Sequence, residues 1–424
     1  MGLKGFKVYA SAYNNEVTGS RCLIVIERPD GLTFRVLIDC GYYQEEKYKY
    51  LNYVDDLSPE KIDAIIITHN HIDHTGLLPK FIRKGYRKKI YMTEITKTMI
   101  GDYLNDSAKQ EKQNAKEMSA RYPDAPKFKV LYDKDDVSET LKHCVGIGYR
   151  KTIEILPGVR LTFWENAHIL GAAMVLLQCS YPNMKPMNYL FSGDFKFENE
   201  FIRVPEFPEW FRKMELIMFT ESTYGTTKRQ EIKECFRNNV LEAFERQQDI
   251  LIGAFALDRM QRILYDFKIM QDEGLIPPNY VICCDGPLGI ATNHKYQAIL
   301  ETHYPDKKDF MPKGIKYMNS KSRESIFDGK SHKIVITTSG MLDSGPARVY
   351  VPMFLTRENA LIHLVGYAAE GTLARKLLNA KRSDTVKIGS HVYKRSAVIK
   401  TTREKSSHAT GDELIEQLIN SFSN

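Results

Sequence analysis

The chain has 424 residues, 43% of them hydrophobic and 27% charged, which is the composition of a globular protein too long for one ordinary core. No run of about 18 apolar residues is present to span a membrane, and the first residues lack a secretory pattern, so we expect a cytoplasmic protein. Seven irregularly spaced cysteines predict reduced thiols, and a net charge of +7 is compatible with a polyanionic partner without selecting one.

Short apolar runs separated by polar loops dominate the first 200 residues and predict the strands of a β-rich sheet system. These runs cover residues 34–38, 62–68, 89–92, 160–164, 173–179 and 187–191. The charged stretch 94–121 contains one glycine and no proline, so it predicts a long helix with a solvated face.

From about residue 207, predicted strands and helices alternate regularly. The strands cover 215–219, 249–254, 280–284, 333–337 and 360–365, and the long helical stretches cover 228–248 and 258–272. This order predicts a parallel sheet with helices on both faces. A helix over 372–380 and a β-rich stretch over 385–402 then resemble the first region again. We therefore predict an α/β domain over 207–370, inserted between β-rich parts over 1–206 and 371–424.

The most informative stretch follows the apolar run 64–67 and contains four side chains of metal-binding type. It reads Thr68-His69-Asn70-His71-Ile72-Asp73-His74. Alternate residues of a loop can converge on one metal while the next Asp and His turn to a second, and imidazole and carboxylate both suit zinc. A polar surface turn would explain a single histidine, but four such side chains at one strand end favour a metal centre.

Two metals need more than four ligands, and further candidates also lie where predicted strands end. His168 follows a strand at 161–165, and Asp194 ends the run 189–194. Alone, His168 would be interpreted as a buried core residue and Gly193-Asp194 as a simple turn. Together with the first cluster, both are candidate ligands.

Other motifs occur in a fixed order over nearly the whole chain. They are Asp39-Cys40-Gly41-Tyr42-Tyr43-Gln44, Glu221-Ser222-Thr223-Tyr224-Gly225, Ala254-Phe255-Ala256-Leu257-Asp258-Arg259, Thr338-Ser339-Gly340-Met341-Leu342, Gly366-Tyr367-Ala368-Ala369-Glu370-Gly371 and Ser407-His408-Ala409. With the histidine cluster, they resemble the metallo-β-lactamase superfamily and, within it, the β-CASP nucleases. The closer similarity is to the branch of the nuclease subunit of the cleavage and polyadenylation specificity factor.

The resemblance implies a metallo-β-lactamase αββα sandwich with an inserted β-CASP α/β domain, and two zinc ions per chain. By this similarity the first zinc takes His69, His71 and His168, the second takes Asp73, His74 and His408, and Asp194 bridges them. Asp39 resembles the buried carboxylate that orients the loop of metal ligands, which here covers residues 68–74 and is called the metal loop. Glu221 matches a carboxylate motif of the family and is the candidate partner of a proton-donating site, with a helix cap as the alternative.

The activity implied by the resemblance is hydrolysis of RNA phosphodiester bonds by a metal-bound hydroxide. His408 stands where relatives that act on DNA commonly have an apolar residue, and this favours RNA over DNA as the substrate. A cleft between the domains is expected to admit a single strand. The candidate substrate-binding residues are Arg259, Ser339, Gly340, Tyr367 and Lys376. Endonuclease and 5′ exonuclease action, and the sequence preference, stay open.

Two departures from the family pattern affect these expectations. Arg375-Lys376 stands where the branch has Lys-His, so the general acid stays unidentified. Only 16 residues (424 − 408) follow His408, so we expect an edge that is open or covered by a second copy or a partner subunit.

A small-molecule thioesterase of the same fold and a non-catalytic RNA-processing subunit are the alternative functions.

Overall fold

The computed structural model describes residues 7–12, 17–45, 47–121, 129–226, 235–366, 368–402 and 404–422, which belong to two compact units. The first unit comprises Met1–Arg229 and Ser407–Asn424, and the second comprises Gln230–Ser406. One unit is therefore inserted into the chain of the other. The borders lie at different positions from the predicted ones, which were 207 and 371.

Two short strands explain this difference. Strand β11 (Ile217–Phe219) pairs in parallel with β10 (Met187–Phe191) and so belongs to a sheet of the first unit. Strand β19 (Val398–Thr402) pairs in parallel with β16 (Ala360–Val365) and extends the sheet of the second unit. An apolar run predicts a strand but not its hydrogen-bonding partner, so the compact units contain these two strands in another arrangement than the predicted domains.

The first unit contains two sheets that share one core. The six-stranded sheet follows the chain order, with β1 (Lys7–Ala12), β2 (Cys22–Glu27), β3 (Thr33–Ile38), β4 (Ala64–Ile66), β5 (Ile90–Thr93) and β6 (Cys144–Ile147). The five-stranded sheet has the order β11-β10-β9-β8-β7, with β7 (Thr152–Leu156), β8 (Val159–Glu165) and β9 (Ala173–Cys179). Fully buried side chains of both sheets, among them Ile24, Val36, Phe163 and Val175, form a single cluster.

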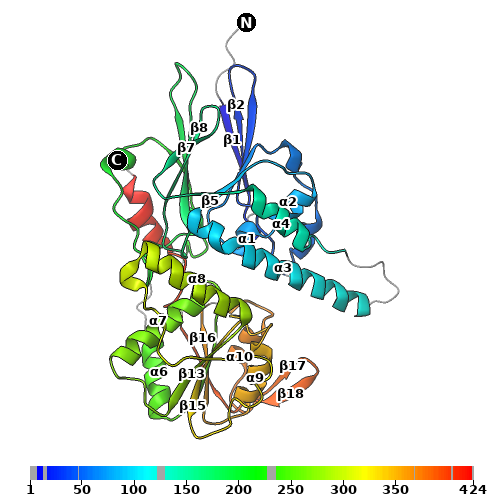
Figure 1. Cartoon of the computed structure of the whole chain (residues 1–424), viewed down its shortest axis with the longest axis vertical. Coiled ribbons are helices and arrows are strands. Elements are labelled where there is room, and N and C mark those ends of the chain that lie inside the picture. Colours follow the sequence, from blue (N-terminus) through cyan, green and yellow to red (C-terminus); the bar gives the residue numbers. More distant parts are fainter. Residues whose placement is uncertain are drawn as a thin grey trace. The chain divides into compact units, whose positions relative to one another are not determined.

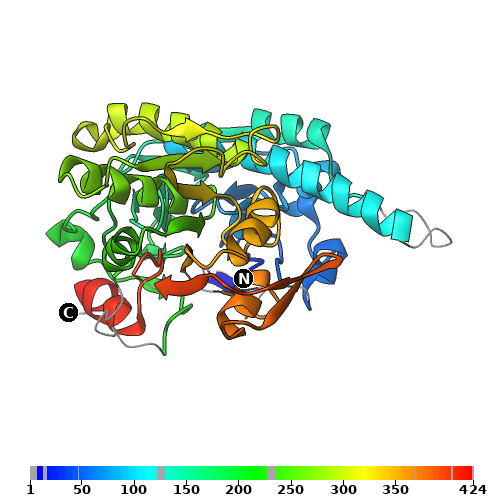
Figure 2. The same cartoon turned by 90° about the horizontal axis from the view of Figure 1, so that it is seen from below.

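Helices cover the outer faces of this pair of sheets. The helices α1 (Ile72–Thr75), α2 (Leu78–Arg83), α3 (Glu94–Arg121) and α4 (Lys134–His143) lie with the six-stranded sheet, and Leu78, Phe81 and Ile100 pack against Leu37 and Ile65 (Figure 1). Helix α3 is the long cyan helix of Figure 2 and matches the predicted helix 94–121.

The other sheet is covered by aromatic packing. Trp164 of β8 stacks on Phe211 of α5 (Glu209–Arg212) with ring centroids 4.4 Å apart. Phe422 follows α11 (Gly411–Glu413), a π-helix (Leu414–Leu418) and a 3₁₀ turn (Ile419–Ser421), and its ring lies 4.9 Å from that of Phe211. The layers are therefore helix, sheet, sheet and helix, and the predicted αββα sandwich is confirmed.

The second unit is built on a sheet with the order β14-β13-β15-β12-β16-β19, in which all neighbouring strands are parallel. Its remaining strands are β12 (Asp249–Gly253), β13 (Tyr280–Asp285), β14 (Lys316–Tyr317) and β15 (His332–Thr337). Its helices are α6 (Phe236–Glu245), α7 (Arg259–Asp272), α8 (Pro287–His303), α9 (Ala347–Leu355) and α10 (Leu373–Asn379), and a hairpin joins β17 (Thr385–Ile388) to β18 (His391–Lys394). The predicted parallel sheet with helical connections is confirmed.

Two further expectations concern the whole chain. None of the seven cysteines forms a disulfide bond. Among the described residues, no helix combines the length and the apolar character that crossing a bilayer requires.

Candidate metal centre

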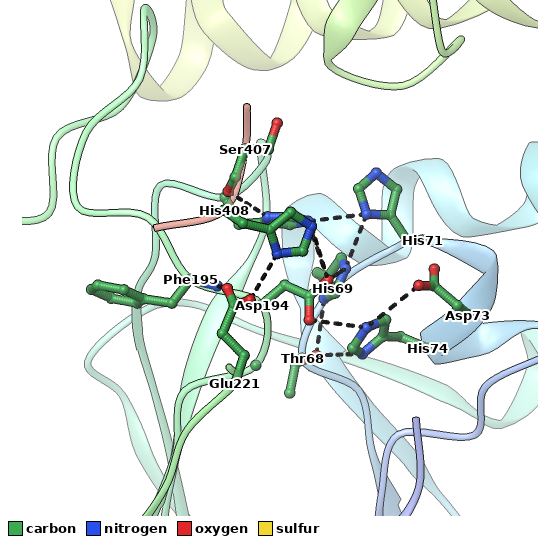
Figure 3. Close-up of polar contacts among 12 residues, drawn as sticks. Thr68, His69, His71, Asp73, His74, Asp194, Phe195, Glu221, Ser407 and His408 are labelled. Atoms are coloured by element: carbon green, nitrogen blue, oxygen red, sulfur yellow. Dashed lines mark hydrogen bonds and ion pairs between the residues drawn. The ribbon is translucent and has the colours of Figure 1, made fainter. Parts of the chain in front are cut away.

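The candidate ligands of the first unit lie in loops that follow its strands. His69 and His71 follow β4, His168 follows β8, and Asp194 follows β10. Figure 3 shows that the side chains of His69, His71 and Asp194 point toward one another, together with those of Asp73, His74, Glu221 and His408. His168 joins them through its contact with His71. The structure thus brings together all seven predicted metal ligands.

Three imidazole nitrogens converge at one point. The Nδ1 atom of His71 lies 3.1 Å from Nε2 of His69 and 3.1 Å from Nε2 of His168. His69 and His168 are fully buried. Three neutral rings satisfy these contacts poorly, because a single proton on Nδ1 of His71 would have to be shared by two acceptor nitrogens. The arrangement matches nitrogens around a shared cation.

The other ring nitrogens have partners that fix which atom faces this point. His168 Nδ1 lies 2.7 Å from the carbonyl oxygen of Ser407, and His74 Nδ1 lies 2.7 Å from Oδ2 of Asp39. Because these oxygens can only accept, each Nδ1 carries a proton, and in the neutral ring each Nε2 keeps its lone pair. The buried Nε2 of His74 has no hydrogen-bond partner among the described residues, so in the neutral ring its lone pair is available to a cation.

Asp194 lies between the groups of ligand atoms. Its Oδ1 is 3.4 Å from Nε2 of His74, and its Oδ2 is 3.8 Å from Nε2 of His69 and 3.7 Å from that of His168. The Nε2 atom of His408 is also 3.8 Å from Oδ2. A carboxylate placed in this way can face two cations at once.

Glu221 contacts His408 rather than the convergent nitrogens. Its Oε2 lies 2.8 Å from Nδ1 of His408, and its Oε1 accepts from the backbone nitrogen of Phe195. Both carboxylate oxygens are therefore engaged, and the Nε2 atom of His408 is left to face Asp194. This geometry favours an orienting role for Glu221, and its role beside a proton donor stays a prediction.

Charge and burial shift the pKa values of these groups in opposite directions. Burial lowers the pKa values of His69 and His168 well below the usual range, and the surrounding histidines lower them further. Burial also raises the pKa of Asp73 to about 6, and the charge of Asp194 contributes. For His408, burial opposes the charged ring, but Asp194 and Glu221 outweigh it and raise its pKa to about 9.

The donor set fits zinc. Zn²⁺ prefers imidazole and carboxylate ligands, and tetrahedral bonds of about 2.0–2.1 Å put neighbouring nitrogens about 3.3–3.4 Å apart, close to the 3.1 Å contacts of His71. Three groups of potential ligands are present among the described residues. They are His69 with His71, His168 and Asp194; Asp73 with His74 and Asp194; and Asp194 with Glu221 and His408.

The loop that carries Asp39 is fitted closely to the metal loop. Asp39 has a φ of 61°, and its Oδ1 accepts from the backbone nitrogen of Thr68 at 2.8 Å. A Cβ atom on Gly41 would lie 1.7 Å from the carbonyl oxygen of Asp73, so only glycine allows this approach. These contacts support the predicted orienting role of Asp39.

Two positioning residues were not predicted. Thr68 Oγ1 lies 2.9 Å from Oδ2 of Asp39 and 3.0 Å from Nδ1 of His69. The Nδ2 atom of Asn166 donates to the carbonyl oxygen of Asp194 at 2.7 Å, while its Oδ1 accepts from the backbone nitrogen of His168 at 2.9 Å. Their positions in the sequence could have indicated both residues, since each lies one or two residues before a candidate ligand.

Comparison with known families agrees with the two units and the site. Residues 22–150 match the family described as the metallo-β-lactamase superfamily, and residues 260–377 match the family described as the Beta-Casp domain. The chain is a metallo-β-lactamase superfamily protein with a Beta-Casp domain. The resemblance predicted from the motifs is confirmed at this level.

Curated relatives extend the similarity beyond these two segments. The transcription termination factor FttA of Methanocaldococcus jannaschii is 30% identical over 375 residues, which cover 85% of this chain and 56% of that protein. The ribonuclease TTHA0252 of Thermus thermophilus is 27% identical over 417 residues, which cover 95% of this chain and 88% of that protein. The chain therefore spans little more than half of the first relative and most of the second.

The predicted substrate contacts of the Beta-Casp domain differ in exposure. Lys376 is exposed on α10, whereas Arg259 is buried at the start of α7 and donates to the carbonyl oxygen of Val365. Ser339 and Gly340 follow β15, and Oγ of Ser339 is buried without a hydrogen-bond partner among the described residues. Tyr367 lies outside the described residues. The role of these five residues in substrate binding stays a prediction.

The Asp39 carboxylate provides a test of the orienting network. We expect Asp39→Asn to weaken zinc binding about 10–100-fold, because one amide oxygen cannot accept from both Thr68 and His74 as the carboxylate does. The measurement is a titration of metal-free protein with Zn²⁺ against a competing chelator. Asp63→Asn is the control, since this carboxylate accepts from Arg35 away from the site. Equal affinity in Asp39→Asn and wild type would contradict the orienting role.

Proposed function

We propose that the protein is a zinc-dependent ribonuclease that hydrolyses phosphodiester bonds of single-stranded RNA. The observation that carries the proposal is the convergence of the His69, His71 and His168 nitrogens beside Asp194. A relative named as a ribonuclease matches 95% of the chain, which supports RNA as the substrate. All seven side chains of the predicted ligand set are present, which a non-catalytic subunit would not require.

In this proposal His69, His71 and His168 would hold one zinc ion, Asp73, His74 and His408 would hold a second, and Asp194 would belong to both sets of ligands. The chemistry that bound zinc would supply is a lower pKa for water and compensation of charge on phosphoryl oxygens, which phosphodiester hydrolysis needs. Asp39 holds the proton of His74 on Nδ1, and the Ser407 carbonyl holds that of His168 on Nδ1. Glu221 keeps the His408 ring oriented through Nδ1.

The metal content is the first test. We expect two zinc ions per chain, because the predicted ligands form two sets that share Asp194, and Asp194 belongs to all three groups of potential ligands among the described residues. Elemental analysis of protein purified without chelator measures this ratio. Less than one metal per chain, together with RNA cleavage that survives exhaustive chelation, would rule out the proposed centre.

The shared carboxylate is the second test. We expect Asp194→Asn to reduce RNA turnover by several orders of magnitude, because a neutral amide cannot balance two cations. The melting temperature of the metal-free protein should change little, since Asp194 belongs to none of the hydrophobic core clusters. End-labelled RNA, single-stranded DNA and a thioester serve as parallel substrates. Near-normal RNA turnover would remove Asp194 from the mechanism, and preferential thioester cleavage would replace the ribonuclease by a small-molecule hydrolase.

Salt dependence tests the contacts of the Beta-Casp domain. RNA binding should weaken steeply with salt, and Lys376→Ala should flatten the plot of log affinity against log salt concentration by about 0.7, the value for one phosphate contact on a single strand. Binding is measured in the Asp194→Asn background, where RNA stays intact. Lys387→Ala, on an exposed lysine of β17, is the control. An unchanged slope in Lys376→Ala would exclude Lys376 from the RNA contacts.

The same titration distinguishes the two predicted basic contacts. Because Arg259 is buried and donates to the Val365 carbonyl, Arg259→Ala should lower the melting temperature in addition to any loss of affinity for RNA. An affinity loss without a change in stability would indicate that Arg259 faces RNA directly.

A further inference from the structure

A buried lysine lies three residues before the ligand candidate His408. Lys405 is 5% exposed, and its Nζ atom donates to Oδ1 of Asp266 at 2.9 Å and lies 2.7 Å from Oδ2. Asp266 belongs to α7 of the second unit. Burial removes the ammonium group of such a lysine from water, and the group keeps its charge only because it forms an ion pair with a carboxylate.

The same helix also holds the backbone of Lys405. The carbonyl oxygen of Lys405 accepts from Nη1 of Arg262 at 3.3 Å, and this guanidinium is itself buried beside Asp258. Tyr296 of α8 donates to the other oxygen of Asp258 at 3.2 Å. Residue 405 is therefore fixed through both its side chain and its main chain.

The residues that follow are fixed to the metal centre. The carbonyl oxygen of Ser407 accepts from His168, and Nδ1 of His408 bonds Glu221. The backbone nitrogen of Ala409 donates to the carbonyl oxygen of Phe195 at 2.8 Å. Only Ser406 lies between the two sets of contacts, and three steps of 3.8 Å keep the Cα atoms of Lys405 and His408 within about 11 Å.

A buried ion pair contributes little net stability compared with well-packed apolar side chains, but it fixes the position of the groups that form it. The network around Lys405 therefore makes a stronger case for positioning than for stability. If it were removed, residues 404–407 would gain conformational freedom that zinc binding at His408 would have to remove again.

We propose that Lys405, held by Asp266 and Arg262 of α7, is a positioning residue for the zinc ligand His408. The inference rests on the proposed metal centre.

The test uses the full chain and measures two quantities, the affinity for Zn²⁺ by chelator competition and the melting temperature of the metal-free protein. Lys405→Met should weaken the more weakly bound zinc about 10–100-fold. Lys405→Arg, which keeps the charge beside Asp266, should retain most of the affinity. Lys268→Met is the control, because Lys268 pairs with Asp272 on the same helix and should leave zinc binding unchanged.

The double variant Lys405→Met/Asp266→Leu separates positioning from stability. It removes both charges, so it should recover the melting temperature while zinc binding stays weak. Wild-type zinc affinity in Lys405→Met, or recovery of affinity together with stability in the double variant, would overturn this inference alone. A wild-type chain that bound no zinc would overturn the metal centre and this inference with it.

Discussion

The convergence of imidazole nitrogens and carboxylates on one buried point is the constraint on which the first unit depends. His71 Nδ1 lies 3.1 Å from two other imidazole nitrogens, and Asp194 faces the same space. A bare carboxylate and several lone pairs directed at one point repel one another in a site with little water. A cation resolves this conflict. The loops must nevertheless be held in place, since each ligand follows a different strand.

The scaffold achieves this with contacts that run between loops. Asn166 connects the loop of His168 to that of Asp194, and Thr68 connects the metal loop to Asp39. Glu221 connects its own loop to His408 and to Phe195. Because each connecting side chain uses donors and acceptors from two loops, a shift of one loop disturbs its neighbours. The αββα core supplies the rigid strand ends from which these loops start.

Basic residues of the second unit show why net charge is a weak guide to nucleic-acid binding. Arg259 is bonded to a backbone carbonyl, Arg262 lies beside Asp258, and Arg323 forms a two-point contact with Asp285. These guanidinium groups stabilise loops at the carboxyl ends of parallel strands and the helices that follow them. Lys376, which is exposed, differs from them in being available to solvent. The count of 60 lysines and arginines therefore overstates the positive charge that a polyanion can reach.

The sequence by itself determined the main elements and the candidate ligands. The charged stretch with one glycine and no proline predicted α3, and the alternation of apolar strands with helices predicted the parallel sheet. The histidine cluster with His168, Asp194 and His408 predicted the metal centre, since these side-chain types have few other uses at strand ends. Tertiary structure alone decided what depends on partners distant in the chain. It placed β11 and β19 in their sheets, directed both oxygens of Glu221 to His408 and Phe195, buried Arg259, and connected Lys405 to α7. Local patterns record the preferences of a residue and its neighbours, whereas hydrogen-bond partners and burial arise only when the chain is folded.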